Sequence, residues 1–280
     1  MGGVEAKDLH VVTVGASLLG HAQRAQIAGL SSSVKVSDEE EWKRFRDDPE
    51  RMDQLRAFLA QAPQHHSAEL NSFLRAVSKR QRRPDQVDVY PVGTQTAAGG
   101  VAAECVGKWL SNQGYGVMQG VLPGAYFADG PSHAEQAERL GEGLVKMLEH
   151  LIDLAMRNAQ NYERIFFNPT GGMKAHVITC ALAGFLTGCQ VYYMHDEFQD
   201  VVFLPPLFYL PNPTERGLLG TLADRKPRVG PEYQSLEQKH GGETLDRLER
   251  FGLLVRERDP ETDRPYRVQI TAKGRRLSEE

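Results

Sequence analysis

Residues 165–176 have the sequence IFFNPTGGMKAH, and this stretch decides the fold of the chain. A short apolar run that favours β-structure meets Pro169, which has no backbone donor and ends a strand ladder. Gly171 and Gly172 are free to adopt positive φ, and an apolar periodic run follows them. The pattern predicts a β-strand, a tight turn and the N-terminus of a helix.

The turn at this junction has the features of an anion-binding site. A helix N-terminus presents unpaired backbone N–H groups at the positive end of its dipole, where phosphate or carboxylate groups bind. Asn168 and Thr170 add hydrogen-bonding side chains, and Lys174 adds a positive charge. Met173 separates Gly172 from Lys174, which is not the spacing of a Walker A loop. The sequence therefore favours anion binding over a purely structural turn, but not a nucleoside triphosphatase.

Two other strand-to-helix junctions place small and polar residues after a strand. A β-branched run at 10–14 and a second run at 87–92 each predict a strand. Ser17 is expected either to contact a ligand at the tip of the first strand or to cap the helix that follows. The first turn holds Gly15, Ala16, Ser17 and Leu18, and the second holds Thr94, Gln95 and Thr96.

Strands alternate with helices through the first two hundred residues. A pair of charged helices is predicted within 38–62, broken at Pro49, and a further helix begins at Ser67. The longest periodic helix precedes the central strand, and a hairpin at 191–203 follows it. This order predicts a mostly parallel, Rossmann-like α/β sheet with helices on both faces.

A long turn-rich loop follows a fourth strand, which is predicted at 115–122. Tyr126 lies on this loop. We expect Tyr126 either to act as part of a lid over a ligand or to anchor the loop to the body of the protein.

The composition is that of a soluble globular protein. The net charge of the 280 residues is −4, so affinity for a polyanion must come from a local basic pocket. The basic run at 79–83 is expected to be a solvated helix end. Cys105, Cys180 and Cys189 lack metal-ligand spacing and are expected to be reduced core residues. With no membrane-spanning run and no secretion signal, we expect a cytoplasmic protein without metal or cofactor.

Prolines between 205 and 213 predict a domain boundary, with one domain over 1–210 and another over 211–280. Three short helices followed by two strands around a charged tip predict a winged helix-turn-helix in the second domain. The helix over 243–251 carries Arg247 and Arg250 beside three acidic residues, so its charge nearly cancels. DNA binding is therefore less favoured than a role in dimerisation or as a lid.

The NPTGGMK segment at 168–174, the turn at 15–18 and the turn at 94–96 resemble the CARF domains of type III CRISPR systems. Such domains are Rossmann-like homodimers that sense cyclic oligoadenylate. Within that group, the chain is most similar to standalone ring nucleases with a C-terminal winged helix. The resemblance implies metal-independent cleavage of cyclic tetra-adenylate to linear di-adenylate with a 2′,3′-cyclic phosphate. Ser17 and Lys174 correspond to the catalytic serine and lysine of the family.

The resemblance also implies a ligand site at the carboxyl edge of the sheet. Its alternative output is transcription regulation, in which the same domain senses cyclic oligoadenylate and the winged helix binds DNA. The family often has an aspartate at the position of Gln95. The expected ligand-binding residues are Gly15, Ala16, Leu18, Thr94, Gln95, Thr96, Tyr126, Asn168, Thr170, Gly171 and Gly172.

Ring opening requires the ribose 2′-hydroxyl to lie in line with the neighbouring phosphorus. Lys174 and the N–H groups of Gly171 and Gly172 would stabilise charge on the phosphoryl oxygens, and Ser17 would bond the scissile phosphate or the 2′-hydroxyl. No histidine is placed as a general base, which predicts a slow enzyme, and His176 is expected to be packed or solvated. A homodimer would match the approximate two-fold symmetry of a four-adenosine ring.

Overall fold

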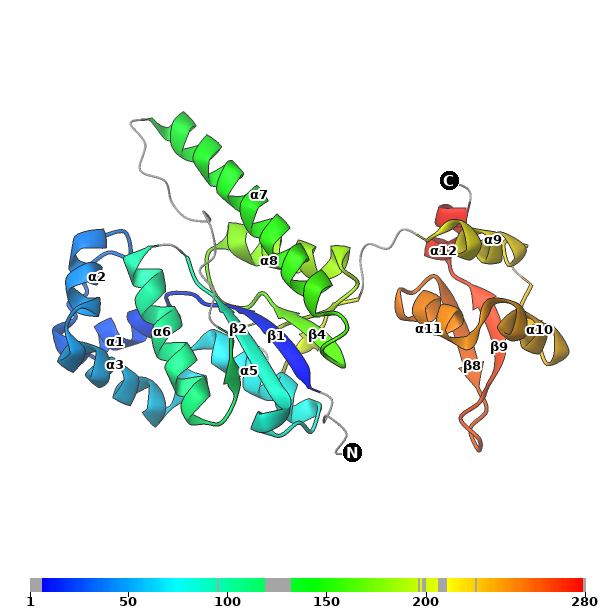
Figure 1. Cartoon of the computed structure of the whole chain (residues 1–280), viewed down its shortest axis with the longest axis horizontal. Helices are drawn as coiled ribbons and strands as arrows, with labels where there is room; N and C mark the ends of the chain where they lie inside the picture. Colours follow the sequence, from blue (N-terminus) through cyan, green and yellow to red (C-terminus); the bar gives the residue numbers. More distant parts are fainter. Residues whose placement is uncertain are drawn as a thin grey trace. The chain divides into compact units, whose positions relative to one another are not determined.

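The computed structural model describes residues 7–94, 96–118, 132–195, 197, 200–205, 211–224 and 226–278. The chain divides into two compact units, Met1–Leu204 (unit 1) and Pro205–Glu280 (unit 2) (Figure 1). Each unit has its own hydrophobic core and is considered by itself.

Unit 1 is built on a six-stranded sheet with the order β3-β2-β1-β4-β5-β6. Neighbouring strands are parallel except for β5 and β6, which form an antiparallel hairpin. This confirms the prediction of a mostly parallel Rossmann-like sheet closed by a hairpin, and the strand order reverses between β1 and β4. The strands are β1 (Asp8–Thr13), β2 (Val87–Val92), β3 (Gly116–Val117), β4 (Arg164–Asn168), β5 (Gln190–Tyr193) and β6 (Val202–Phe203).

Helices cover both faces of this sheet (Figure 1). Alternate residues of β1 supply the two cores: Leu9 and Val11 pack with α7 and α8, whereas Val12 packs with α1, α2, α3, α5 and α6. The helices are α1 (Ser17–Arg24), α2 (Glu39–Arg46), α3 (Pro49–Gln61), α4 (Pro63–His66), α5 (Ala68–Lys79), α6 (Ala97–Asn112), α7 (His133–Asn158) and α8 (Lys174–Leu186), with 3-10 turns at Ile27–Gly29 and Pro84–Gln86.

Capping residues set the predicted helix boundaries. Asp48 accepts hydrogen bonds from two N–H groups in the first turn of α3, which confirms the break at Pro49. Ser67 caps α5 in the same way, at the predicted start of that helix. Of the strand predicted at 115–122, residues 115–118 are described and only the two residues of β3 are strand, while residues 119–131, including Tyr126, lie outside the described residues.

Unit 2 packs helices against a small antiparallel sheet of order β7-β9-β8. The three helices and the hairpin occur where the sequence predicts them, whereas β7 and α12 were not expected. The winged helix-turn-helix itself stays a prediction. The elements are α9 (Pro213–Thr221), β7 (Arg228–Val229), α10 (Pro231–His240), α11 (Gly242–Arg250), β8 (Leu254–Arg258), β9 (Pro265–Ile270) and α12 (Ala272–Ser278).

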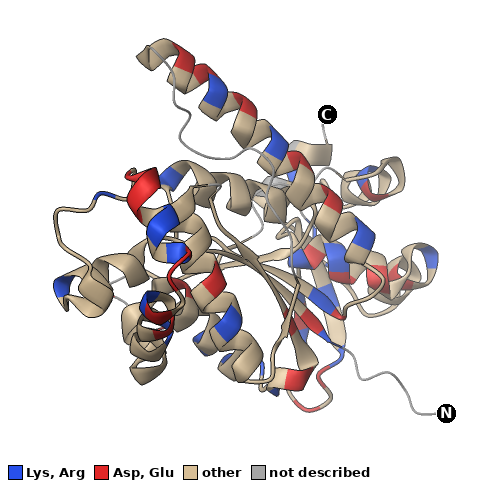
Figure 2. Cartoon of the chain, turned by 60° about the vertical axis from the view of Figure 1, so that its left-hand side comes forward, with Lys and Arg blue, Asp and Glu red and all other residues tan. Residues whose placement is uncertain are grey.

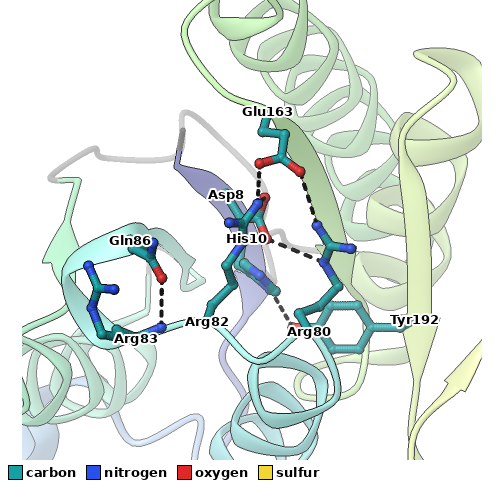
Figure 3. Close-up of polar contacts among 8 residues, drawn as sticks. All are labelled: Asp8, His10, Arg80, Arg82, Arg83, Gln86, Glu163 and Tyr192. Carbon is teal, nitrogen blue, oxygen red and sulfur yellow. Dashed lines mark hydrogen bonds and ion pairs between the residues drawn. The ribbon is translucent and has the colours of Figure 1, made fainter. Parts of the chain in front are cut away.

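Arg80 and Arg82 of the basic run at 79–83 are part of a partly buried ion-pair network, so the expectation of a solvated helix end is wrong for these two residues (Figure 3). Arg80 and Arg82 both bond Asp8, whose side chain is fully buried, with Nε to Oδ2 distances of 3.4 and 3.0 Å. Both arginines also pair with Glu163. A buried carboxylate requires such partners. The network joins the start of β1, the end of α5 and the segment before β4.

Candidate functional site

The turns that follow β1 and β4 lie against each other at the carboxyl edge of the sheet. Val12 of β1 pairs in register with Asn168 of β4, so both strands end at nearly the same level. Gly15 packs so closely on the second turn that a Cβ atom there would lie 2.3 Å from the backbone N of Gly172. Open α/β sheets bind ligands at such a point, where the strand order reverses. The fold thus brings together two of the three predicted turns.

Gly171 and Gly172 are needed for different physical reasons. Gly172 has a φ of 105°, as expected for glycine in a tight turn. Both glycines were expected to be free to adopt positive φ, but Gly171 lies outside the left-handed region. A Cβ atom on Gly171 would instead lie 2.8 Å from the Thr13 carbonyl oxygen and 2.9 Å from Oε2 of Glu69. Its role is to permit this close approach.

Two helix N-termini in the described part of this edge have no cap from the side chain of their own N-cap residue. The N-cap residues of α1 and α8 are Ala16 and Met173, and neither makes a capping hydrogen bond. The first N–H groups of such helices lack intrahelical partners and attract anions. Lys174 is the exposed first residue of α8, and among the described residues its ammonium group has no ion-pair partner. This arrangement suits a phosphate group.

The third predicted turn differs, because the N-terminus of α6 already has internal partners. Thr96 Oγ1 accepts a hydrogen bond from the Gly99 N–H at 3.0 Å and lies 2.8 Å from the Thr94 hydroxyl. The Ala97 N–H donates to a carboxylate oxygen of Glu39 at 2.9 Å. Thr96 is thus a helix cap in this structure, and ligand contact by this turn stays a prediction. Gln95, in the same turn, lies outside the described residues.

Ser17 contacts α5 rather than capping its own helix. It is the first residue of α1, so the alternative that it is the N-cap is wrong. Its hydroxyl donates to Oε2 of Glu69 at 3.1 Å and accepts from the Ala68 N–H at 3.3 Å. The side chain of Leu18 is fully buried in the core, so only its backbone remains for the predicted ligand contact.

Glu69, in the first turn of α5, is a site residue that the sequence did not single out. Its side chain is fully buried, and burial raises the pKa of Glu69 to about 7 although hydrogen bonds from its own N–H and from Ser17 oppose the shift. Within the described part of the chain, Oε1 has no hydrogen-bond partner. Acidic residues are common in first helical turns, so no local signal marked this one.

Residues 64–207, just over half of the chain, match the model of a family described as CRISPR-associated protein (Cas_APE2256). The chain belongs to this family of CRISPR-associated proteins. The match spans Glu69, β4, the turn after β4 and the start of α8. It supports the CRISPR-associated, CARF-type part of the resemblance. Ring cleavage and the winged helix remain predictions.

Asn168 in this CRISPR-associated protein lies beneath the turn and is fully buried. Its Nδ2 donates to Ser72 Oγ at 2.8 Å and to the Glu69 carbonyl oxygen at 3.3 Å, while Oδ1 accepts from Thr170 Oγ1 at 2.6 Å. Thr170 also accepts from the Met194 N–H at 3.4 Å. These bonds pair Asn168 with protein groups in this structure, and ligand contact by Asn168 stays a prediction. Asn168 fixes the start of α5, and with it Glu69, relative to β4.

Other predicted features concern the core and the membrane. His176 is buried on α8, which agrees with the packed alternative. Cys105 and Cys180 are fully buried, Cys189 is partly buried, and all three are free, as expected.

Within the described ranges, every helix is too short or too polar to span a bilayer. The same ranges hold no group of three or more His, Cys, Asp or Glu side chains placed to bind a metal ion.

Proposed function

We propose that this CRISPR-associated protein is a ring nuclease. It binds cyclic tetra-adenylate and cleaves it to linear di-adenylate with a 2′,3′-cyclic phosphate, which switches off the signal of a type III CRISPR system. The observation that carries this proposal is the contact between the turns after β1 and β4, where Gly15 meets Gly172 at the reversal of strand order.

The contact supports the proposal because it places two uncapped helix N-termini, Ser17 and the first residue of α8 around one edge. Transesterification needs a 2′-hydroxyl held in line with phosphorus and donors for the charge that grows on the phosphoryl oxygens. The N–H groups at the start of α8 and the Lys174 ammonium are suited to that charge. Ser17 is suited to the 2′-hydroxyl or the scissile phosphate.

The proposed assembly is a homodimer, which would supply two such edges to one ring. A cyclic tetranucleotide repeats its phosphates around an approximate two-fold axis. Each copy would then cleave one phosphodiester bond, and two cleavages would give the two halves of the ring.

The test is incubation of the full chain with cyclic tri-, tetra- and hexa-adenylate, followed by chromatography of the products. Lys174→Ala is expected to lower the rate of ring opening by about 10² or more, because the main side-chain charge for the phosphoryl oxygens is lost. Lys108→Ala, an exposed lysine on α6, is the matched control and is expected to keep the wild-type rate. Undiminished linear product from Lys174→Ala would refute the assignment.

Excess EDTA is expected to leave the rate unchanged, because the proposed attack by the 2′-hydroxyl needs no metal ion. Loss of turnover in the chelator, restored by a divalent cation, would contradict that mechanism. A wild-type chain that binds a ring but leaves it intact would reduce the proposal to a sensor.

The second candidate is a transcription regulator, supported by the order of helices and hairpin in unit 2. Its charges favour DNA less, because Arg247 pairs with Glu215, which is 1% exposed, and Arg256 pairs with Asp246 and Glu249. Acidic and basic residues are also interspersed along the helices in Figure 2. A gel shift that appears only with cyclic tetra-adenylate would favour the regulator.

A further inference from the structure

Burial of the Glu69 side chain has a high free-energy cost for a residue with a purely structural role. Its carboxyl group is fully buried, yet among the described residues only Oε2 has a hydrogen-bond partner and Oε1 has none. Burial of an ionisable group with an unsatisfied oxygen opposes folding. The group lies directly against Gly171, in the turn proposed to hold the phosphate, where a Cβ atom would meet Oε2 at 2.9 Å.

The hydrogen bonds of Ser17 have a defined direction when Glu69 is ionised. A carboxylate only accepts, so the Ser17 hydroxyl must donate its proton to Oε2 at 3.1 Å. One lone pair of Oγ accepts from the Ala68 N–H at 3.3 Å. Among the described residues no other group donates to Oγ, so its remaining lone pair can accept one more hydrogen bond. Ser17 in this state can therefore receive a proton from a substrate hydroxyl but has no second proton to donate to a phosphate.

We propose that Glu69 acts through Ser17 as the final acceptor of the proton that the ribose 2′-hydroxyl loses during ring opening. This inference rests on the proposed ring nuclease activity. The 2′-oxygen forms a bond to phosphorus while the bond from phosphorus to the 5′-oxygen breaks. The 2′-proton passes to Ser17 Oγ as the Ser17 proton passes to Glu69. The 5′-oxygen takes one proton from solvent and Glu69 returns one, so the step is balanced.

The proton affinity of Glu69 suits this task. Burial raises the pKa of Glu69 to about 7, which is near the value at which a general base works best at neutral pH. The negative charge of a bound phosphodiester would raise the pKa of Glu69 further. Ionised Glu69 also repels that phosphodiester. The turnover number and the Michaelis constant should therefore both increase as the pH rises through neutrality.

Titratable groups on neighbouring elements could also change the rate with pH, because α4 packs on α5 and α1 packs on α4. His21 is on α1, His65 and His66 are on α4, and Lys174 begins α8. The three histidine rings cluster with centroids 5.3 to 6.0 Å apart. Burial and the neighbouring Arg24 lower the pKa of His21, so a His21→Gln variant is needed to separate its titration from that of Glu69.

The experiment measures kcat and KM for cyclic tetra-adenylate from about pH 5.5 to 9, since kcat/KM reports the free enzyme and kcat the complex. Wild-type kcat/KM should rise tenfold per pH unit and level off near pH 7, and the kcat profile should level off at higher pH. Glu69→Gln should lower kcat at pH 8 by about 10² or more and give a flat profile, because glutamine cannot take up the proton.

Ser17→Ala and a double variant separate a proton relay from a structural role, and two other variants serve as controls. Ser17→Ala should also flatten the profile, and the double variant Ser17→Ala with Glu69→Gln should be no slower than the slower single variant, since both remove one relay. His21→Gln should keep the inflection near pH 7. Glu149→Gln, an exposed glutamate on α7, should keep both rate and profile.

Different results would overturn the proposed ring nuclease activity and the proposed proton relay through Glu69. A wild-type chain that opens no ring overturns the ring nuclease, whatever Glu69 does. A wild-type chain that opens the ring, with Glu69→Gln keeping the inflection near pH 7, overturns the relay even if the rate falls. If Glu69→Gln does not fold, Ser17→Ala decides: a retained inflection overturns the relay, and a lost one supports it.

Discussion

Replacing Glu69 by glutamine should make unit 1 more stable at neutral and alkaline pH, in a manner that depends on pH. The folded protein keeps this carboxyl group in a fully buried position, where its charged form is disfavoured. The unfolded chain exposes it to water. Glutamine has nearly the same shape and no titratable proton, so Glu69→Gln removes the cost of ionisation without opening a cavity.

The size of the effect follows from the raised pKa, from the ordinary value of 4.5 to about 7. The native state holds the proton more tightly, so this stabilising contribution is complete below about pH 4.5 and is lost as the pH rises to about 7. One pKa unit corresponds to about 1.4 kcal/mol, so the full loss is on the order of 3 kcal/mol. The stability of Glu69→Gln relative to wild type should therefore rise by that amount between about pH 4.5 and 8.

Urea denaturation followed by tryptophan fluorescence is the appropriate assay, because both tryptophans of the chain lie in unit 1. Trp42 is on α2 and Trp109 is on α6, so the signal reports on this unit within the full-length protein. Other titrating groups, including buried His10, are the same in both proteins and cancel in the difference. Glu149→Gln is the control, and its effect should stay within about 0.5 kcal/mol at every pH.

A difference between Glu69→Gln and wild type that does not change over this pH range would refute the reasoning. It would mean that Glu69 titrates at the same pH in the folded and unfolded chains. A difference that grows as the pH falls would have the wrong sign, and would show that the folded protein favours the ionised carboxylate.

Two other substitutions test the packing of unit 1 by the same urea assay. Gly15→Ala should destabilise unit 1 by about 1–3 kcal/mol, because the new Cβ atom would lie 2.3 Å from the backbone N of Gly172. Gly141 is a helical glycine with nothing within 4 Å of its Cβ position, so Gly141→Ala should instead stabilise unit 1 by about 0.5–1 kcal/mol. Equal effects at the two sites would contradict the close approach. Arg82→Ala should cost roughly 3 kcal/mol because it weakens the pairing of buried Asp8, and a cost below about 1 kcal/mol would show that the pair is dispensable.

The features that the sequence predicted correctly are those encoded in neighbouring residues. Pro169 cannot continue a strand ladder and Gly172 can take a positive φ without strain, so the strand, turn and helix at 164–186 were predictable from local sequence. Capping residues such as Asp48 and Ser67 fixed helix starts for the same reason. The alternation of these elements then limited the fold to a mostly parallel sheet.

The features that the sequence missed depend on contacts between distant residues. Glu69 differs from an ordinary first-turn acid because the fold buries its side chain and places Ser17, 52 residues earlier, against it. Arg82 is paired rather than solvated because the fold buries Asp8, which is 74 residues away in sequence, beside it. A serine, an arginine or a glutamate has the same local pattern in either setting, so periodicity and spacing cannot separate the two outcomes.

The carboxylate of Glu39 has a consequence for ligand choice. It comes from α2, in the stretch of chain between β1 and β2, and it occupies the first N–H of α6. A helix end that is already neutralised attracts a second anion poorly. In the proposed site, this acidic residue would therefore compete with a phosphate at the third turn and favour phosphate binding between β1 and β4. The position of Glu39 on α2 would thus influence which turn of the sheet edge binds the anion.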